Sequence, residues 1–429
     1  MKIHSWRSMG LVVAWLLMVA GGSAAHGQGA IGGGGIYVDA DGVLQARELE
    51  LDARQVHGQS RAWKDLCEQD GLVCVSLPRL FEQARLAIEA GEPIPEAAAY
   101  LGGMVQIRYI QVNPSTGDLI LAGLRDEVDD ADPWRPIGRQ TGRPVLRLED
   151  LVVALRTVGP GARNGRFGCS IDMPEGAQQR FVDALNRSRR ASRRERMEQM
   201  ARAVGPQQAR FWGVTPDTRF AAVCLEADYR MKRLALGLDH TPVRGVRSAV
   251  TGNAQRYTRC WFLPEYEPLR VSADGSQYEL RGPRLKLDTS SSAIQDNAPA
   301  SESAERFARQ ATEKMGELSV AIPSWADLAN LTDLAVVAAL IRTDRLHERV
   351  QWDLAWVLDD EDGYPVTRYE VPDQVQTLVT SLRSGYAAGG VVMDLAAIVA
   401  QREEAEDGPR AGLARPDADD SLTWSVASP

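Results

Sequence analysis

The sequence predicts an α+β fold with hairpin-containing mixed sheets packed against helices, a helical C-terminal part and a disordered tail. Residues 105–112 alternate apolar and polar side chains, and the turn 113–118 returns the chain into a second strand at 119–122. This is the pattern of a β-hairpin. Apolar residues recur at three- and four-residue spacing over 77–90 and 217–237, as in helices with one buried face. Hairpins and helices together favour α+β over a doubly wound parallel sheet.

An N-terminal α+β region is predicted over residues 36–130. Residues 36–44 have the pattern of a strand, an Asp-Gly turn and a second strand. The helix at 77–90 is expected to end at Gly91, because glycine adopts the left-handed conformation that closes a helix. Pro95 then begins a second short helix, since proline is favoured at the first helical position.

A central α+β domain is predicted over residues 140–288. A long polar helix is expected over 175–204, and the helix at 217–237 is the clearest helical pattern in the chain. A short helix is also expected at 149–157. Strands are predicted at 143–148, near Cys169, and at 208–214, 257–263, 269–272 and 277–280.

The remainder of the chain is predicted to be a linker, a mainly helical region and a tail. Residues 289–303 are polar and read as the linker, and residues 304–401 as the helical region. Residues 333–341 are almost continuously apolar, which indicates a helix buried on all sides. Residues 402–429 contain seven acids and three arginines, so we expect a disordered acidic tail.

Residues 1–25 have the pattern of a signal peptide. Lys2 and Arg7 precede the apolar run 10–20, and the small residues 23–25 suit a cleavage site. The run is shorter than the roughly 17 residues that a membrane span needs, which favours cleavage over a retained anchor. We therefore expect a protein exported to the periplasm or the extracellular space, with no transmembrane segment after signal cleavage.

Composition and motifs exclude several classes of function. The chain has 429 residues, of which 44% are hydrophobic and 25% charged, the balance of a globular protein. Its formal net charge of −9 argues against nucleic acid as a partner. The common P-loop, zinc-protease and serine-nucleophile motifs are absent, so the sequence predicts no cofactor and no metal site. Acidic clusters at 39–42 and 359–363 lack the calcium-loop spacing and are interpreted as turns.

Export directs attention to the five cysteines. Cys67 and Cys74 flank a short segment with an Asp-Gly turn signal. A disulfide between them would close this loop and add roughly 2–3 kcal/mol of stability. The alternative is two separate buried thiols, and the spacing alone does not decide between these two readings.

The stretch 216–245 is richest in chemically useful residues. Asp228 and His240 are the candidate catalytic residues, because a carboxylate beside a histidine can orient it for proton transfer. The alternative is a helix whose surface carries ion pairs, with Asp217 as its cap. Four cations of the stretch are candidate binding residues, because they can hold an anion: Arg230, Lys232, Arg233 and Arg244.

A second candidate binding surface is the basic stretch within 178–210, which contains nine arginines and three acids. Arginine guanidinium groups match phosphate and carboxylate groups, so an acidic protein or an anionic envelope polymer is a candidate partner. The alternative is a solvated protruding helix. The residues that would bind are Arg189, Arg190, Arg193 and Arg194.

The segments 218–220, 226–233 and 242–245 resemble a family of exported bacterial proteins catalogued only as a domain of unknown function. Residues 142–156 and 333–341 fit the same family. A further fit lies at 261–269, and the resemblance extends over about 36–345. It implies export and a single folded body, and it assigns no catalytic residue. The chain after 350 and the basic stretch 186–196 lie outside the matching segments.

These observations predict an exported cell-envelope protein. The favoured interpretation is a non-catalytic binding or assembly protein, because no compact set of acid, base, nucleophile or metal ligands is evident. The alternative is an envelope hydrolase that uses the polar cluster around Asp228 and His240. The two differ in whether those side chains meet in a pocket.

Overall fold

We describe the fold from a computed structural model. The signal segment 1–25 and most of the predicted linker 289–303 lie outside the described residues. The residues described are 36–38, 43–46, 53–68, 71–162, 165–240, 243–249, 258–289, 302–378, 387–405, 408–415 and 421–426.

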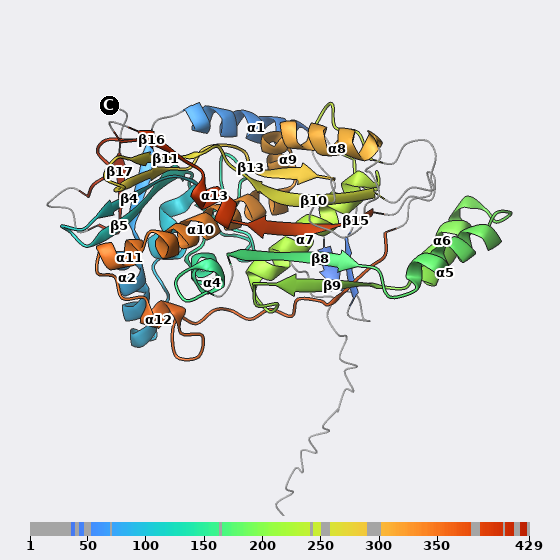
Figure 1. The fold of residues 1–429 in the computed structure, drawn as a ribbon, viewed down its shortest axis with the longest axis horizontal. Helices are drawn as coiled ribbons and strands as arrows, with labels where there is room; N and C mark the ends of the chain where they lie inside the picture. The colour runs from blue at the N-terminus through green and yellow to red at the C-terminus, as the bar shows by residue number, and fades with distance from the viewer. Residues whose placement is uncertain are drawn as a thin grey trace, which may run out of the picture.

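The predicted α+β class is confirmed, with two large mixed sheets in the body (Figure 1). The first is eight-stranded. Its strands, in order across the sheet, are β1 (Ile36–Val38), β2 (Val43–Ala46), β14 (Gln374–Val375), β9 (Gln207–Trp212), β8 (Arg166–Asp172), β15 (Ala387–Asp394), β10 (Thr258–Glu265) and β13 (Arg284–Asp288). Parallel pairing occurs between β10 and β15 and between β14 and β2.

The second sheet is seven-stranded and contains the predicted hairpin. Its strands, in order, are β16 (Arg402–Ala405), β11 (Leu269–Ser272), β12 (Gln277–Glu279), β4 (Met104–Asn113), β5 (Asp118–Arg125), β3 (Leu72–Ser76) and β17 (Thr423–Val426). Strands β4 and β5 pair antiparallel across the 113–118 turn, as expected. A small ribbon joins β6 (Val128–Asp129) to β7 (Ile137–Gly138).

The helices surround and separate the sheets. They are α1 (Ala53–Glu68), α2 (Leu77–Ala90), α3 (Glu96–Ala99), the 3₁₀ turn η1 (Leu101–Gly103), α4 (Leu148–Val158), α5 (Ala177–Arg187), α6 (Arg193–Val204), α7 (Arg219–Ala235), α8 (Glu302–Glu313), α9 (Met315–Ala321), α10 (Pro323–Thr343), α11 (Leu346–Arg349), α12 (Ala355–Leu358) and α13 (Ala396–Ala400). The Gly91 stop of α2 is confirmed, with φ of 69°.

Helix α10 is the centre of the hydrophobic core. It packs against α4 and α7 and also contacts β4 and β13, so it touches both sheets. Among the described residues it is the one helix long and apolar enough to cross a membrane, and it is buried inside the body. The helix predicted around 333–341 is thus confirmed as a core helix, because its whole circumference meets protein.

The three predicted regions do not form separate sheets. The eight-stranded sheet takes strands from the N-terminal region, the central domain and the predicted helical region, which supplies β14 and β15. One continuous apolar cluster includes Ile107, Phe262 and Leu334 from all three regions. Strand pairing between segments far apart in sequence therefore unites them around one core.

The prediction of a disordered tail at 402–429 is wrong for its described parts. Strand β16 pairs with β11, and β17 pairs antiparallel with β3. Leu413 and Trp424 are buried, and the Trp424 indole donates a hydrogen bond to the Leu413 carbonyl. The acidic composition concealed these apolar residues, whose burial anchors the tail to two sheet edges.

Of the two alternatives for Cys67 and Cys74, the structure has the separate thiols and not the disulfide. Both residues are free thiols, as are the other three cysteines. Cys74 lies inside β3, which is hydrogen-bonded on both sides by β5 and β17. Cys67 lies near the end of α1 and is half-buried. The two thiols therefore occupy separate packing environments instead of closing a loop.

Candidate functional site

Helix α7 contains most of the predicted site residues. It begins after Thr218, whose hydroxyl accepts a hydrogen bond from the Ala221 N–H, so the cap is Thr218 and not the expected Asp217. Gly237, with φ of 67°, follows its C-terminal end as predicted. Every residue from Arg219 to Ala235 is buried, so the polar side chains of α7 have no solvent face.

Five buried charged side chains form one ion network beside α7. Arg219 contacts Asp150 of α4 at 2.6 Å and Asp327 of α10 at 2.8 Å, measured from nitrogen to oxygen. Arg135, between β6 and β7, contacts Asp327 at 2.5 Å and Glu226 of α7 at 2.7 Å. Because these five side chains come from four segments, this network fixes α4, α7 and α10 relative to one another.

The two carboxylates bound to Arg219 respond differently to burial. Burial raises the pKa of Asp327, but the guanidinium groups of Arg219 and Arg135 outweigh it, and the net pKa is below the usual value. Asp150 has a pKa raised by burial, which Arg219 only partly offsets. Its Oδ1 atom has no hydrogen-bond partner among the described residues. Asp150 is therefore the least compensated member of the network.

Three predicted binding cations are also internal. Lys232 donates to Asp228 at 2.9 Å, which confirms the expected i,i+4 pair but places it in the core. Asp239 accepts from Arg233 at 2.7 Å and lies 3.3 Å from Arg230. These cations neutralise carboxylates of their own chain. The expectation that they line a binding surface is wrong, because neighbouring elements cover that face of α7.

The structure does not assemble the expected pair of Asp228 and His240. Asp228 is fully buried, and its Oδ2 atom binds Lys232, while its Oδ1 atom has no hydrogen-bond partner within the described part of the chain. His240 is exposed beyond the end of α7, and Arg244 is exposed a few residues later. The hydrogen bond that would orient a catalytic histidine is therefore not made by Asp228.

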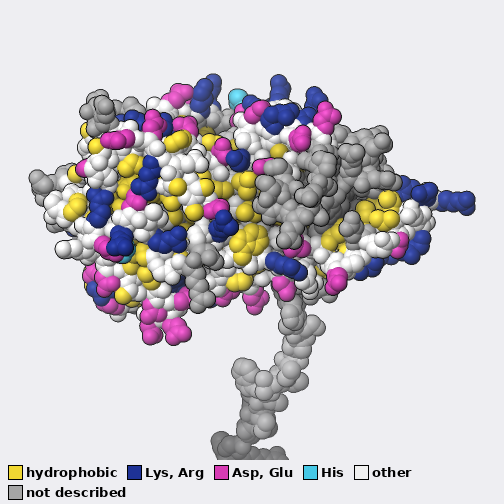
Figure 2. Space-filling view, in the orientation of Figure 1, with side chains coloured by type: hydrophobic (Ala, Val, Ile, Leu, Met, Phe, Trp, Pro, Cys, Tyr) yellow, Lys and Arg dark blue, Asp and Glu magenta, His cyan; other side chains and the backbone are white. Residues whose placement is uncertain are grey.

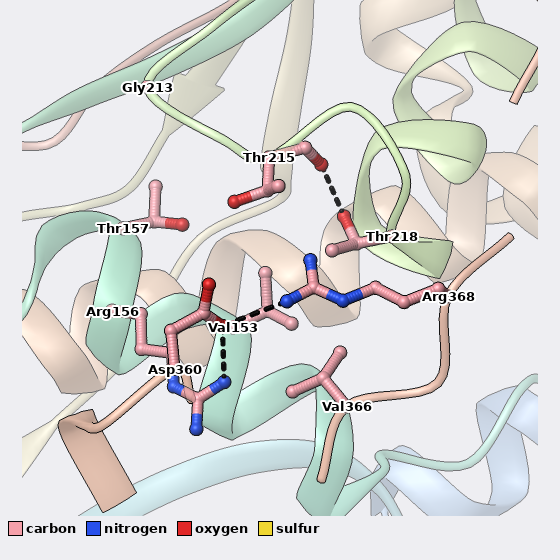
Figure 3. Close-up of a pocket in the computed structure, with 9 residues that line it drawn as sticks. All are labelled: Val153, Arg156, Thr157, Gly213, Thr215, Thr218, Asp360, Val366 and Arg368. Atoms are coloured by element: carbon pink, nitrogen blue, oxygen red, sulfur yellow. Dashed lines mark hydrogen bonds and ion pairs between the residues drawn. The ribbon is translucent and has the colours of Figure 1, made fainter. Parts of the chain in front are cut away.

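A small cavity lies near the start of α7 (Figure 3). Arg156 and Arg368 both donate to Asp360 Oδ1, at 2.9 and 3.0 Å, on one side of it. Thr157 and Thr215 line it as well. The cavity volume of about 50 Å³ fits water-sized groups and is far below the size of a ligand pocket. Asp360, from the acidic turn 359–363, is thus neutralised by arginines.

The described part of the chain contains no cluster of metal-ligating side chains. No three histidine, cysteine, aspartate or glutamate side chains converge there in an arrangement that could hold a metal ion. The buried carboxylates around α7 are instead bound to arginine or lysine.

The second candidate surface is a helical hairpin, which we call the arm (residues 177–204, α5 and α6). The sequence predicted one continuous helix, but the chain turns at 188–192. Ser192 and Glu195 form a capping box that begins α6, with the Ser192 hydroxyl accepting from the Glu195 N–H and the Glu195 carboxylate accepting from the Ser192 N–H. The Ser-x-x-Glu signal for this break was present in the sequence.

The arm projects from one end of the body (Figure 1). Its helices pack mainly against each other through the buried Ala184 and Met200, with Phe181 and Leu185 beside them. The Arg180 guanidinium donates to the Ala203 carbonyl and so links the two helices. The arm therefore has a small apolar core of its own.

The arm is basic. It contains eight arginines and three acids, a net charge of +5 in a chain of net charge −9. Arg189, Arg190 and Arg194 are exposed, as predicted. The side chain of Arg193 lies outside the described structure. Figure 2 shows dark blue side chains at the tip of the arm and yellow side chains on its visible face.

A groove of about 380 Å³ lies between α5 and α6. Arg187 and Arg202 line it together with Gln199, and Ala184 and Ala203 give it an apolar part. Arg202 contacts Glu198 at 3.2 Å, whereas Arg187 is exposed and has no acidic partner among the described residues. The groove therefore combines positive charge with small apolar side chains.

Comparison with known proteins supports the family resemblance in one segment. Residues 169–249 match the family model of a protein of unknown function, DUF1598. The match extends from β8 through the arm and β9 to the segment after α7. It thus includes the stretch 186–196 of the arm, which lay outside the segments that carried the resemblance. Searches of curated proteins and of solved structures gave no match.

Sequence reasoning missed the ion network because its members are far apart along the chain. A signal was nevertheless present. Asp150 and Asp327 interrupt apolar helical segments, and a carboxylate in such a segment needs a buried cation. The identity of that cation was not accessible, because Arg135 and Arg219 reach these acids only in the folded chain.

Proposed function

We propose that this protein is an exported, non-catalytic binding protein of the cell envelope and that the arm holds an acidic protein partner. The observation that carries the proposal is the projecting, net positive arm with exposed arginines. A stable fold has no need of such an element, since the body has a continuous core without it. The N-terminal sequence 1–25 supports export.

The proposal favours binding over hydrolysis because the two candidate catalytic residues do not form a hydrogen bond with each other. Asp228 is paired with Lys232, and it makes no hydrogen bond to His240. The hydrolase alternative in this form lacks its central contact. The exposed arginines of the arm, by contrast, are oriented toward solvent, where they can meet a partner.

The chemistry of the arm favours a protein over a polymer. Arg187 and Arg202 lie beside Ala184 and Ala203, and Val182 of α5 is 41% exposed. A surface that mixes guanidinium groups with apolar side chains suits a partner with carboxylates next to apolar residues. A purely anionic polymer would gain nothing from the apolar positions.

The binding test uses poly-L-glutamate as a defined acidic polypeptide and a quadruple variant of the arm. This variant has Gln in place of Arg189, Arg190, Arg193 and Arg194. We expect it to bind poly-L-glutamate at least tenfold more weakly at low salt, because about four ionic contacts are lost. The matched control replaces four exposed arginines elsewhere with Gln, namely Arg125, Arg139, Arg166 and Arg345. It has the same net charge as the arm variant.

Equal weakening in both variants would mean that overall charge, and not the arm, attracts the acid. A parallel experiment measures binding to vesicles of phosphatidylglycerol. Arm-dependent binding to vesicles together with arm-independent binding to poly-L-glutamate would contradict a protein partner.

Export is tested separately by N-terminal sequencing of the protein from cell fractions. A mature chain that begins near His26 in the periplasmic or extracellular fraction is expected. A full-length chain beginning at Met1 in the cytosol would contradict the compartment.

A further inference from the structure

One face of the eight-stranded sheet packs against α7. Cys169 of β8 and Phe262 of β10 belong to the core on this side, and α7 lies behind these strands in Figure 1. Because successive side chains of a strand point to opposite faces, the neighbours of these residues point away from α7. We call this second side the outer face. Trp212 of β9 and Trp261 of β10 lie on it and are half-buried.

Both tryptophans lie across a glycine of the adjacent strand. Trp212 pairs with Gly168 of β8, and Trp261 pairs with Gly390 of β15. A Cβ atom at Gly168 would lie 2.5 Å from Trp212 Cζ2, and a Cβ atom at Gly390 would lie 2.6 Å from Trp261 Cζ3. Only glycine therefore lets the rings approach the sheet so closely. One such pair shields a glycine backbone, whereas two rings on the same face form a broader apolar surface.

The two tryptophan–glycine pairs adjoin each other in the middle of the sheet. Strands β8 and β15 lie side by side between β9 and β10. Gly168 pairs with Val392, and Gly390 pairs with Ser170. Small side chains thus occupy the space between the two rings, and both rings belong to one surface.

The charged residues that border this surface neutralise one another. Their side chains are between 34% and 69% exposed. Among the described residues of the outer face they form three ion pairs: Arg166 with Asp394, Arg210 with Asp172, and Lys286 with Glu265. Together these pairs carry no net charge, in contrast to the arm. Their remaining donor and acceptor positions suit neutral hydroxyl groups.

The position of the tryptophans within the sheet disfavours an extended peptide as the ligand. A peptide that adds to a sheet needs a strand edge with unpaired backbone groups. Strand β8 is paired on both sides, by β9 and β15, and β15 is paired by β8 and β10. A ligand of the outer face must therefore be held by side chains, through apolar contact in the middle and hydrogen bonds at the border.

We propose that the outer face binds a neutral, extended polysaccharide, with sugar rings stacked on Trp212 and Trp261. A pyranose ring has C–H groups on its faces and hydroxyl groups around its edge. The faces pack against the indole rings, and the hydroxyls exchange hydrogen bonds with the bordering ion pairs. Equatorial linkages keep such a chain flat enough to contact both rings. The site is separate from the arm and does not depend on the proposed function.

The test measures binding of chitohexaose and cellohexaose, two neutral chains with equatorial linkages, to the full mature chain by calorimetry. We expect at least one of them to bind. Trp212→Ala and Trp261→Ala should each weaken binding at least tenfold, because each removes one stacking surface. Trp212→Phe keeps an aromatic ring and should bind more tightly than Trp212→Ala. Trp356→Ala is the matched control, because Trp356 is also half-buried but belongs to α12, and it should bind like the wild type.

Val392→Arg carries the test if the tryptophan variants do not fold. Val392 is half-buried on the outer face, so a long charged side chain there covers the surface without removing a ring. It too should weaken binding at least tenfold. The proposal is overturned if the wild type binds neither hexasaccharide, or if the folded variants bind as tightly as Trp356→Ala. Tenfold tighter binding of carboxymethylcellulose than of neutral hydroxyethylcellulose would also overturn it, because the partner would then be anionic.

Discussion

The arm and helix α7 are neighbours in sequence and both carry many arginines, yet they use them in opposite ways. In α7 the arginine, lysine, aspartate and glutamate side chains are buried, and they form specific ion pairs. In the arm they are exposed, and they border a small apolar core. The difference teaches that charge content does not determine exposure. What decides is whether other segments supply counter-charges and apolar cover.

Two bridging carboxylates make the comparison quantitative. Asp327 joins Arg135 and Arg219 inside the body, where all three side chains are 4% exposed or less. Glu198 joins Arg194 and Arg202 on the arm, where the arginines are 91% and 78% exposed. Water solvates the arm arginines when their partner is lost, but it cannot reach those of the body.

The largest expected effect is from a charge placed on the sheet-facing side of α7. Met231 is fully buried, and its methyl group packs against Gly389 of β15. Met231→Asp should lower the free energy of unfolding by about 5 kcal/mol, because it buries a carboxylate in an apolar position. Urea denaturation measures the change. A loss under about 0.5 kcal/mol would contradict the burial of this face.

The second-largest effect is expected from a substitution that breaks the buried ion network. Asp327→Asn leaves Arg135 and Arg219 without their shared carboxylate and should lower the free energy of unfolding by about 4 kcal/mol. Chemical denaturation of the whole chain is the measurement. Glu198→Gln on the arm is the matched control and should change stability by less than about 0.5 kcal/mol. Similar losses in the two variants would remove the distinction between the regions.

The third effect is a pH dependence from the buried pair in α7. Burial, only partly offset by Lys232, raises the pKa of Asp228 from 3.8 to about 6. Between these values the folded state holds a proton that the unfolded chain has released. The contribution of Asp228 to the free energy of unfolding therefore falls as pH rises through this window, by about 3 kcal/mol.

The measurement compares wild type with Asp228→Asn at pH 4, 5 and 6, so that groups common to both cancel. The stability of the wild type relative to the variant should decrease as pH rises. Parallel stability curves would show that Asp228 does not titrate in this range.

The smallest effect is expected from a substitution at the start of helix α6 in the arm. Ser192→Ala removes the capping hydroxyl of α6 and should destabilise that helix by about 1 kcal/mol. Hydrogen exchange should show faster exchange in α6, with α7 unchanged. Unchanged exchange in α6 would contradict the capping box, and equal acceleration in α7 would show that the two regions unfold together.

Local patterns predicted local structure well. The hairpin of β4 and β5, the stop of α2 at Gly91 and the buried α10 follow from periodicity and turn residues. The break between α5 and α6 was also encoded, in Ser192 and Glu195, but charge composition obscured it. The candidate site was predicted less well, because whether Arg230 and Arg233 face solvent depends on which segments cover them.

By itself the sequence determined the α+β class, the amphipathic and fully apolar helices and the presence of a basic stretch. These features depend on neighbours within a few residues, where spacing fixes which side chains share a face. Only the tertiary structure decided that Asp327 pairs with Arg135 and Arg219, that the tail joins both edges of the seven-stranded sheet, and that Lys232 is buried against Asp228. Such contacts join residues far apart in the chain, and burial sets their energy, so they exist only once the core has formed.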